Sequence, residues 1–212
     1  MRFLIYLLTF CIGMQLQARE FKDLRSFGDI SVSTLYLFTS PSCPHCRVFH
    51  KSIFPELIRK YVKTKKAQIV IVDMPYDPIT MNAVMIMRCL PEEKATKMMG
   101  WLYENQSKWL SNKDPDFVLK QYAQVLGMYA TDFQACLQDN NLKEAIEQQR
   151  DNMSSLYNVH GWPTVALRQG HTVQLYAGTD KRMILSNLDK EIKQFQDDLK
   201  KRTSQSKKQH DD

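Results

Sequence analysis

The first half of the chain carries two strongly apolar runs separated by a helical pattern. Residues 34–39 and 67–73 are almost continuously apolar, aromatic or β-branched, which is typical of buried strands. Between them, apolar residues recur every three or four positions from 43 to 61, as on the buried side of a helix. Pro55 falls within this helix and is expected to kink it. The order predicts a parallel βαβ unit, preceded by an irregular or short-strand lead-in at 19–32.

The period changes after residue 77. From 78 to 157 the apolar positions keep a helical spacing, and no convincing strand pattern is present. Breaks at Pro, Gly and Asn predict helices at about 79–89, 92–109, 115–126, 131–138 and 142–157. Successive helices between two strand-bearing regions indicate an inserted all-helical subdomain.

The strand period returns in the last third of the chain. Two short strands, at 164–168 and 172–177, are expected to form a tight hairpin. An amphipathic helix follows at 180–199. The predicted class is therefore α/β, with segments 19–77 and 158–199 forming one domain around the helical insert.

Charge is concentrated at the C-terminus. The net charge is +6, and residues 200–212 hold five basic and two acidic residues without an apolar anchor. This tail is expected to be a disordered, solvated end, with a membrane-surface or partner-binding role as the alternative. The rest of the chain is close to neutral and has no basic stripe with interleaved aromatic residues, so nucleic-acid binding is not expected.

The N-terminus has the three parts of a secretory signal peptide. Arg2 precedes an apolar run from Phe3 to Ile12, and an A-x-A-like cleavage site follows at Leu16-Gln17-Ala18. The apolar run is shorter than the roughly 20 residues that a spanning helix needs, so cleavage is favoured over an uncleaved anchor. Residues 1–18 therefore predict export, and a periplasmic location is expected.

The residues with the clearest chemistry are Cys43-Pro44-His45-Cys46, between the first strand and the first helix. A C-x-x-C pair at a helix N-terminus is a redox arrangement, because unpaired N–H groups and the helix dipole stabilise a thiolate. Cys43 is the expected nucleophile and Cys46, one turn deeper, the expected resolving cysteine. His45 can favour the Cys43 thiolate by a hydrogen bond or partial charge, and Pro44 supplies rigidity.

Half of a zinc site is the alternative for this tetrapeptide. A structural zinc ion needs four ligands, usually completed by a second C-x-x-C or a histidine pair. Cys89 and Cys136 are isolated in the sequence, and His160 and His171 lack ligand spacing. Redox chemistry is therefore expected, without a metal or cofactor.

Cys89 and Cys136 are the cysteines that remain once the leader and the C-x-x-C pair are set aside. An even number of cysteines in an exported chain favours two disulfides. Since Cys43 and Cys46 form a local pair, Cys89 and Cys136 are expected to form a structural disulfide. Two buried free thiols are the alternative.

The order βαβ, helical insert, ββα, with C-x-x-C at the first helix and Gly161-Trp162-Pro163 before the third strand, resembles the DsbA-like thiol:disulfide oxidoreductases of the thioredoxin superfamily. The resemblance implies a thioredoxin fold (βαβ–ββα) with an inserted all-helical subdomain. It also implies that Pro163 is a cis-proline whose loop faces the cysteines and pairs with the substrate backbone. Trp162 departs from the small or β-branched residue usual before this proline, and it can stack on the disulfide, contact substrate or pack in the core.

The same resemblance implies a function. An exported dithiol oxidase would introduce disulfides into unfolded or reduced periplasmic or secreted proteins through a mixed disulfide on Cys43. A membrane partner of the DsbB type would reoxidise it, and the protein would act as a monomer. A disulfide isomerase or reductase is the alternative enzyme. A soft-metal carrier, or a client-binding module that uses the methionine-rich insert, is the alternative without catalysis.

Overall fold

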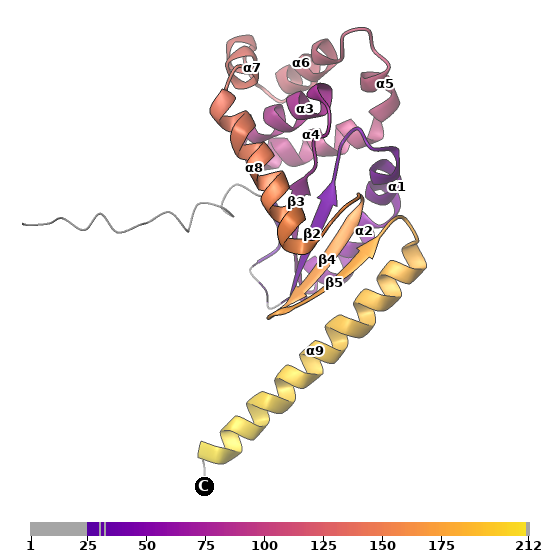
Figure 1. The fold of residues 1–212 in the computed structure, drawn as a ribbon, viewed down its shortest axis with the longest axis vertical. Coiled ribbons are helices and arrows are strands. Elements are labelled where there is room, and N and C mark those ends of the chain that lie inside the picture. The colour runs from indigo at the N-terminus through magenta and orange to yellow at the C-terminus, as the bar shows by residue number, and fades with distance from the viewer. Residues whose placement is uncertain (1–24, 30, 32, 211–212) are drawn as a thin grey trace, which may run out of the picture.

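A computed structural model describes residues 25–210 except residues 30 and 32, with side chains to residue 205. The predicted signal peptide, residues 1–18, lies outside the described residues. The described strands form one sheet in the order β1-β3-β2-β4-β5 (Figure 1). They are β1 (Ser26–Phe27), β2 (Ser33–Thr39), β3 (Gln68–Asp73), β4 (Thr164–Gln169) and β5 (Thr172–Ala177).

The pairing of the strands is that of the predicted thioredoxin fold. Strands β2 and β3 are parallel, and β1, β4 and β5 run antiparallel to their neighbours. The parallel pair is joined through a helical segment, whereas β4 and β5 form a hairpin that turns at Gly170 with φ of 60°. A positive φ favours glycine at this turn because glycine lacks a Cβ atom.

The helix predicted over residues 43–61 is divided into three pieces. They are α1 (Pro44–Ser52), α2 (Phe54–Leu57) and the π-helical segment η1 (Ile58–Val62). Pro55 lies in the first turn of α2, where its missing N–H leaves no helical bond unmade. A kink was predicted at Pro55, and the structure has a break between Ser52 and Phe54 instead. The ring of Pro55 excludes a continuous helix because it would clash with the preceding turn.

Between residues 78 and 157, all of which are described, the chain is helical and without strands. The helices are α3 (Pro78–Cys89), α4 (Glu92–Glu104), α5 (Gln106–Leu110), α6 (Pro115–Val125), α7 (Ala130–Leu137) and α8 (Asn140–Tyr157). The single helix predicted over 92–109 is wrong, because the chain breaks at Asn105. The Asn105 side-chain amide donates to the Trp101 carbonyl at 3.1 Å, a local bond that competes with regular helix.

The sheet is covered on both faces, and alternating side chains of β2 serve the two cores. Leu35 and Leu37 belong to the larger core, which includes side chains of α1, the C-terminal helix α9 (Lys181–His210) and the insert. Tyr36 and Phe38 point to the opposite face, where α8 covers them with Met153 and Tyr157. In Figure 1, α3 to α7 gather beyond the upper end of the sheet, at the carboxyl ends of β2 and β3.

The predicted disorder of residues 200–212 is wrong for the part of the tail that is described. Helix α9 (Lys181–His210) continues through it and extends past the lower end of the sheet (Figure 1). The apolar side of α9 ends near Leu199, and residues 200–205 are exposed. Lys, Arg and Gln are good helix formers, and the packed first half of α9 supplies the nucleus that an isolated tail would lack.

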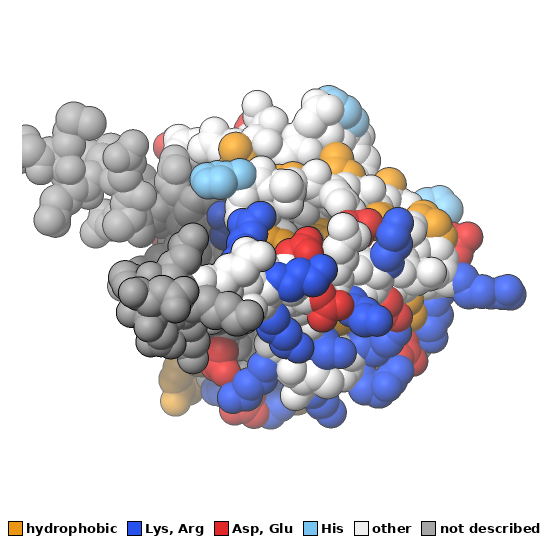
Figure 2. Space-filling view, turned by 90° about the horizontal axis from the view of Figure 1, so that it is seen from below, with side chains coloured by type: hydrophobic (Ala, Val, Ile, Leu, Met, Phe, Trp, Pro, Cys, Tyr) orange, Lys and Arg blue, Asp and Glu red, His pale blue; other side chains and the backbone are white. Residues whose placement is uncertain are grey.

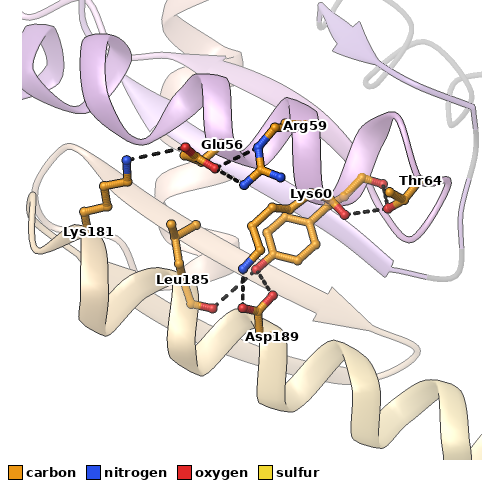
Figure 3. A network of polar contacts seen from close by, with 8 residues as sticks. Glu56, Arg59, Lys60, Thr64, Lys181, Leu185 and Asp189 are labelled. Carbon is orange, nitrogen blue, oxygen red and sulfur yellow. Dashed lines mark hydrogen bonds and ion pairs between the residues drawn. The ribbon is translucent and has the colours of Figure 1, made fainter.

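Polar contacts attach the first half of α9 to the α2–η1 segment (Figure 3). The Tyr61 hydroxyl donates to Asp189 Oδ1 at 2.8 Å, and Lys60 forms an ion pair with the same carboxylate. Lys181 Nζ lies 3.6 Å from Glu56 Oε1. This network, together with the apolar side of α9, fixes the helix along one face of the sheet.

The end of the molecule below the sheet is rich in charge. Figure 2 looks onto this end, where Lys and Arg side chains are interspersed with fewer Asp and Glu side chains. Lys63, Lys65 and Lys66 are exposed there, in the turn between η1 and β3. Within the described ranges, no helix is both long and apolar enough to cross a membrane.

Candidate redox site

Cys43 and Cys46 lie where β2 passes into α1, at the end of the sheet nearest the insert. Cys43 is the N-cap of α1, and its Sγ accepts a hydrogen bond from the Cys46 backbone N–H at 3.3 Å. Pro44 occupies the first turn of the helix, where a missing N–H costs nothing. The two cysteines are free thiols; Cys43 is 7% exposed and Cys46 is completely buried. Of the two residues, only Cys43 keeps any exposed surface.

The two thiols have opposite acid strengths. The hydrogen bond from the Cys46 thiol, helped by the backbone N–H groups of Cys46 and His45, lowers the pKa of Cys43 to about 6 against the opposing effect of burial. Burial, and the hydrogen bond given to Cys43, raise the pKa of Cys46 far above its ordinary value. At neutral pH the pair therefore holds a Cys43 thiolate beside a Cys46 thiol.

His45 acts on Cys43 chiefly through its main chain. Its side chain is exposed, and its charge contributes less to the lowered pKa of Cys43 than its backbone N–H does. The sequence-based expectation for His45 was a hydrogen bond or a partial positive charge, and both lower the pKa of Cys43. The helix N-terminus, which any residue at position 45 would provide, supplies more of this effect.

The loop before β4 closes the site from the opposite side. The Trp162–Pro163 peptide bond is cis, as the resemblance implies, and the Trp162 carbonyl oxygen lies 3.8 Å from Cys43 Sγ. The Trp162 ring is half-buried and packs 5.8 Å from the ring of Tyr76, which is 53% exposed. Tyr76 was not predicted, since nothing near it in the sequence suggests that the loop after β3 reaches the cis-proline loop.

The insert holds the loop that carries Cys43. Gln106, from α5, is buried and donates through Nε2 to the carbonyl oxygens of Pro41 and Cys43 at 2.8 and 2.9 Å. The Ser42 hydroxyl meets the Thr80 hydroxyl of α3 at 2.5 Å. Both contacts join residues far apart in the chain, so no local sequence pattern could reveal them.

Behind Cys46 lies a buried group of polar and aromatic side chains. The backbone N–H of Ser40 donates to Cys46 Sγ at 3.4 Å, and the hydroxyls of Thr39 and Tyr103 are 2.6 Å apart. His50 stacks on Tyr103 with ring centroids 4.3 Å apart, and burial lowers the pKa of His50 to about 4. Thr39 and Tyr103 are buried, and the partly buried His50 is uncharged at neutral pH.

The other two cysteines of the described residues are joined. Cys89, at the end of α3, and Cys136, in α7, form a disulfide with Cα atoms 6.3 Å apart. This is the predicted pairing, and it ties two helices of the insert. Among the described residues, no group of three or more His, Cys, Asp and Glu side chains could hold a metal ion.

Comparison with known proteins agrees with this architecture. A family model described as Thioredoxin matches residues 30–181. The chain belongs to this family. It is 30% identical over 111 residues to a Rickettsia bellii protein named as a protein-disulfide oxidoreductase, covering 51% of this chain and 42% of that protein. A Rickettsia conorii protein of the same name is 27% identical over 106 residues, covering 50% and 38%. The match thus spans less than half the length of these relatives.

Solved structures, among them a DsbA protein and BdbD, share the fold. Wolbachia pipientis alpha-DsbA1 aligns with a TM-score of 0.75 at 17% identity, covering 84% of this chain and 95% of that one. BdbD from Bacillus subtilis aligns with a TM-score of 0.66 at 17% identity, covering 81% and 94%. The thioredoxin fold with a helical insert is thus DsbA-like.

Proposed function

We propose that this thioredoxin-family chain is a thiol:disulfide oxidoreductase that works as a dithiol oxidase on exported proteins. The observation that carries the proposal is the asymmetry of the C-x-x-C pair. Cys43 is 7% exposed and has a pKa near 6, whereas Cys46 is completely buried with a raised pKa. A stabilised Cys43 thiolate favours the reduced form of the pair, so the disulfide form is a strong oxidant.

The chemistry proceeds by two exchanges. A client thiolate attacks Cys43 Sγ of the oxidised pair, because Cys46 is buried and cannot be approached. The new bond joins client to Cys43, the Cys43–Cys46 bond breaks, and Cys46 leaves and takes up a proton. A second client thiolate then attacks the client sulfur of the mixed disulfide, and Cys43 leaves as thiolate. Two electrons have passed from the client dithiol to the protein, and a low pKa makes Cys43 a good leaving group.

The proposed compartment is the periplasm, and the proposed oxidant of the reduced pair is a membrane protein of the DsbB type. The signal-peptide pattern of residues 1–18 supports export. The names of the relatives support disulfide exchange with protein substrates. Reduced exported proteins are therefore the proposed clients, and a monomer suffices for the two exchanges.

The reduction potential of the Cys43–Cys46 pair tests the oxidase proposal. We expect a potential well above the roughly −270 mV of thioredoxin, together with a Cys43 thiolate that titrates near pH 6. Equilibration with glutathione and thiolate absorbance against pH measure the two quantities. An ordinary thiol pKa with a thioredoxin-like potential would refute the oxidase and leave a reductase.

Trapping identifies the clients. A Cys46→Ala variant cannot form the Cys43–Cys46 disulfide, but its Cys43 thiolate can attack a client disulfide, which breaks that bond and releases one client thiolate. Because no Cys46 thiol is present to displace the client, Cys43 should remain attached to it as a mixed disulfide. A Cys43→Ala variant, which keeps the buried thiol, should trap none.

A further inference from the structure

A buried cluster of three charged side chains, which the redox chemistry does not use, lies beside β1 and the end of β3. Arg25 immediately precedes β1, Asp73 is the last residue of β3, and Arg88 lies in the last turn of α3. Arg25 Nη2 donates to Asp73 Oδ1 at 2.6 Å, and Arg88 Nη2 donates to Asp73 Oδ2 at 3.1 Å. None of the three side chains is more than 8% exposed. One buried carboxylate therefore faces two guanidinium groups.

Arg25 keeps donors that no described residue satisfies. Its Nη2 is used by Asp73, but its Nε and Nη1 atoms are buried without a hydrogen-bond partner. A buried donor without an acceptor costs free energy, and an arginine cannot relieve that cost by losing its proton. The Arg25 carbonyl oxygen accepts from the Ile71 N–H at 2.8 Å, which fixes the residue against β3. The position of Arg25 therefore favours a further acceptor with negative charge.

A cavity of about 520 Å³ adjoins this cluster. Arg25 and Arg88 both line it, so the donors of the cluster border open space. Much of the remaining lining is apolar and comes from the α3–α4 region and from α8: Met87, Leu90, Ala95, Leu142, Ala145 and Ile146. Apolar walls with a small number of polar groups are typical of a site for a small molecule.

The charges around the cavity favour one kind of anion. Two arginines and one aspartate leave the buried cluster with an excess of positive charge. Glu92 also lines the cavity, but it is exposed, so solvent screens its charge more than it screens the buried charges. The Glu92 carboxylate still opposes a second negative charge in the cavity. A monoanion is therefore favoured over sulfate or a phosphate dianion.

We propose that this cavity binds a small organic monocarboxylate. The carboxylate accepts hydrogen bonds from Arg25, and the aliphatic body packs against the apolar lining. The inference does not depend on the proposed function, since neither redox cysteine and no residue of the cis-proline loop lines the cavity. Binding stabilises the folded protein, because the lining comes both from the start of β1 and from the insert.

Isothermal titration calorimetry of the purified protein with isocaproate tests the proposal. Isocaproate carries one carboxylate on a branched aliphatic chain. We expect it to bind at least about tenfold more tightly than isocaproamide, its uncharged analogue, because the amide lacks the charge that Arg25 requires. It should also bind at least about tenfold more tightly than acetate, which lacks the apolar body. Saturating isocaproate should raise the Tm of the protein.

Two variants locate the ligand. Arg25→Gln removes the guanidinium and should weaken isocaproate binding by about tenfold or more. Ala145 is exposed and lines the cavity, so Ala145→Trp should fill the cavity from its open side and block binding while Arg25 is intact. Arg59→Gln is the matched control, because Arg59 is an exposed arginine of η1 that does not line the cavity. Its affinity for isocaproate should equal that of the unmodified protein.

Contrary results would overturn the proposal in distinct ways. Absence of isocaproate binding, or binding that survives both Arg25→Gln and Ala145→Trp, would show that the cavity is not the site. Affinity for acetate or inorganic phosphate equal to that for isocaproate would show that the cavity does not select an organic monocarboxylate.

The chain itself offers another source of a carboxylate, since Glu20 and Asp23 precede Arg25 in the sequence. A double variant, Glu20→Gln with Asp23→Asn, tests this source. If it lowers the free energy of unfolding as much as Arg25→Gln does, a side chain of the protein satisfies Arg25 and the ligand proposal fails. An unchanged free energy of unfolding, together with unchanged isocaproate binding, supports a ligand from outside the chain.

Discussion

At the level of single residues, the pair Cys43 and Cys46 shows how position alone can make two identical side chains chemically different. Cys43 caps a helix and receives hydrogen bonds, whereas Cys46 lies under it against an apolar interior. The motif and its place before a helix were sufficient to predict that Cys43 begins the helix and that Cys46 lies one turn deeper. The residues behind it, His50, Tyr103 and Gln106, could not be predicted. They meet the site only through the tertiary fold, and their sequence surroundings resemble those of ordinary helix residues.

The lowered pKa of Cys43 predicts a pH-dependent stability of the reduced protein. The folded pKa, about 6, lies below the unfolded value, near 9.0. The unfolded chain therefore binds more protons between these values, and the stabilisation is fully present above pH 9 and lost as pH falls through 6. The free energy of unfolding of the reduced protein, measured by urea titration, should rise from pH 6 to pH 9.

Two comparisons isolate the thiolate in that measurement. The oxidised protein has no thiol at position 43, so its stability should lack this rise. A Cys43→Ala variant in reducing buffer should behave in the same way. A rise that persists in the variant would assign the pH dependence to another group.

At the level of elements, the helical insert serves as a support for the redox loop. Its α3 and α7 are joined by Cys89–Cys136, which closes a loop with a sequence separation of 47 residues. Its α5 reaches the loop through Gln106. The helical period predicted the insert, but not the break at Asn105 that creates α5. Helix propensity is a weak guide to the position of such a break. Here the Asn105 side chain donates a hydrogen bond to the Trp101 carbonyl, which competes with the regular helix.

Replacement of Gln106 by Leu is expected to weaken both the fold and the acid strength of Cys43. The carbonyls of Pro41 and Cys43 would lose a buried donor, at a cost of about 2 kcal/mol in the free energy of unfolding. The loosened loop would hold the N-terminus of α1 less firmly against Cys43, so the Cys43 pKa should rise. Thiolate absorbance and urea unfolding measure the two effects.

Gln124→Leu is the control for this change. Gln124 is an exposed residue of α6, so its replacement should leave both the Cys43 pKa and the stability nearly unchanged. If Gln106→Leu lowers stability but leaves the Cys43 titration in place, Gln106 supports the fold without positioning the thiolate.

At the level of the whole molecule, the redox site and the charged end lie at opposite ends of the sheet. The cysteines follow the carboxyl end of β2, at the upper end of the sheet. The basic turn after η1 and the C-terminal end of α9 lie at and beyond the lower end of the sheet (Figures 1 and 2). The overall order of strands and helices was readable from hydrophobic period. The helical tail was not, because composition alone cannot tell that a packed helix will continue into a polar extension.

Truncation after Leu199 is expected to leave the body of the protein intact. Residues 200–205 are exposed, so their removal should change the free energy of unfolding by no more than about 0.5 kcal/mol, with some loss of helical circular dichroism. In contrast, Ile192→Ala, within the buried part of α9, should cost about 2 to 5 kcal/mol. A large loss on truncation would mean that the extension contacts the body.

Cys43 and Trp162 are far apart in the sequence, and this separation determines when the redox site can form during synthesis and folding. The thiol and the carbonyl oxygen it faces are 119 positions apart, with the whole insert between them. During synthesis the chain emerges N-terminus first, so both cysteines of the motif are exposed long before the cis-proline loop has been made. Until β4 docks beside β2, the cysteines have no loop against which a client could be aligned. If the proposed function holds, completion of the sheet is therefore also the moment at which the protein can align a client chain.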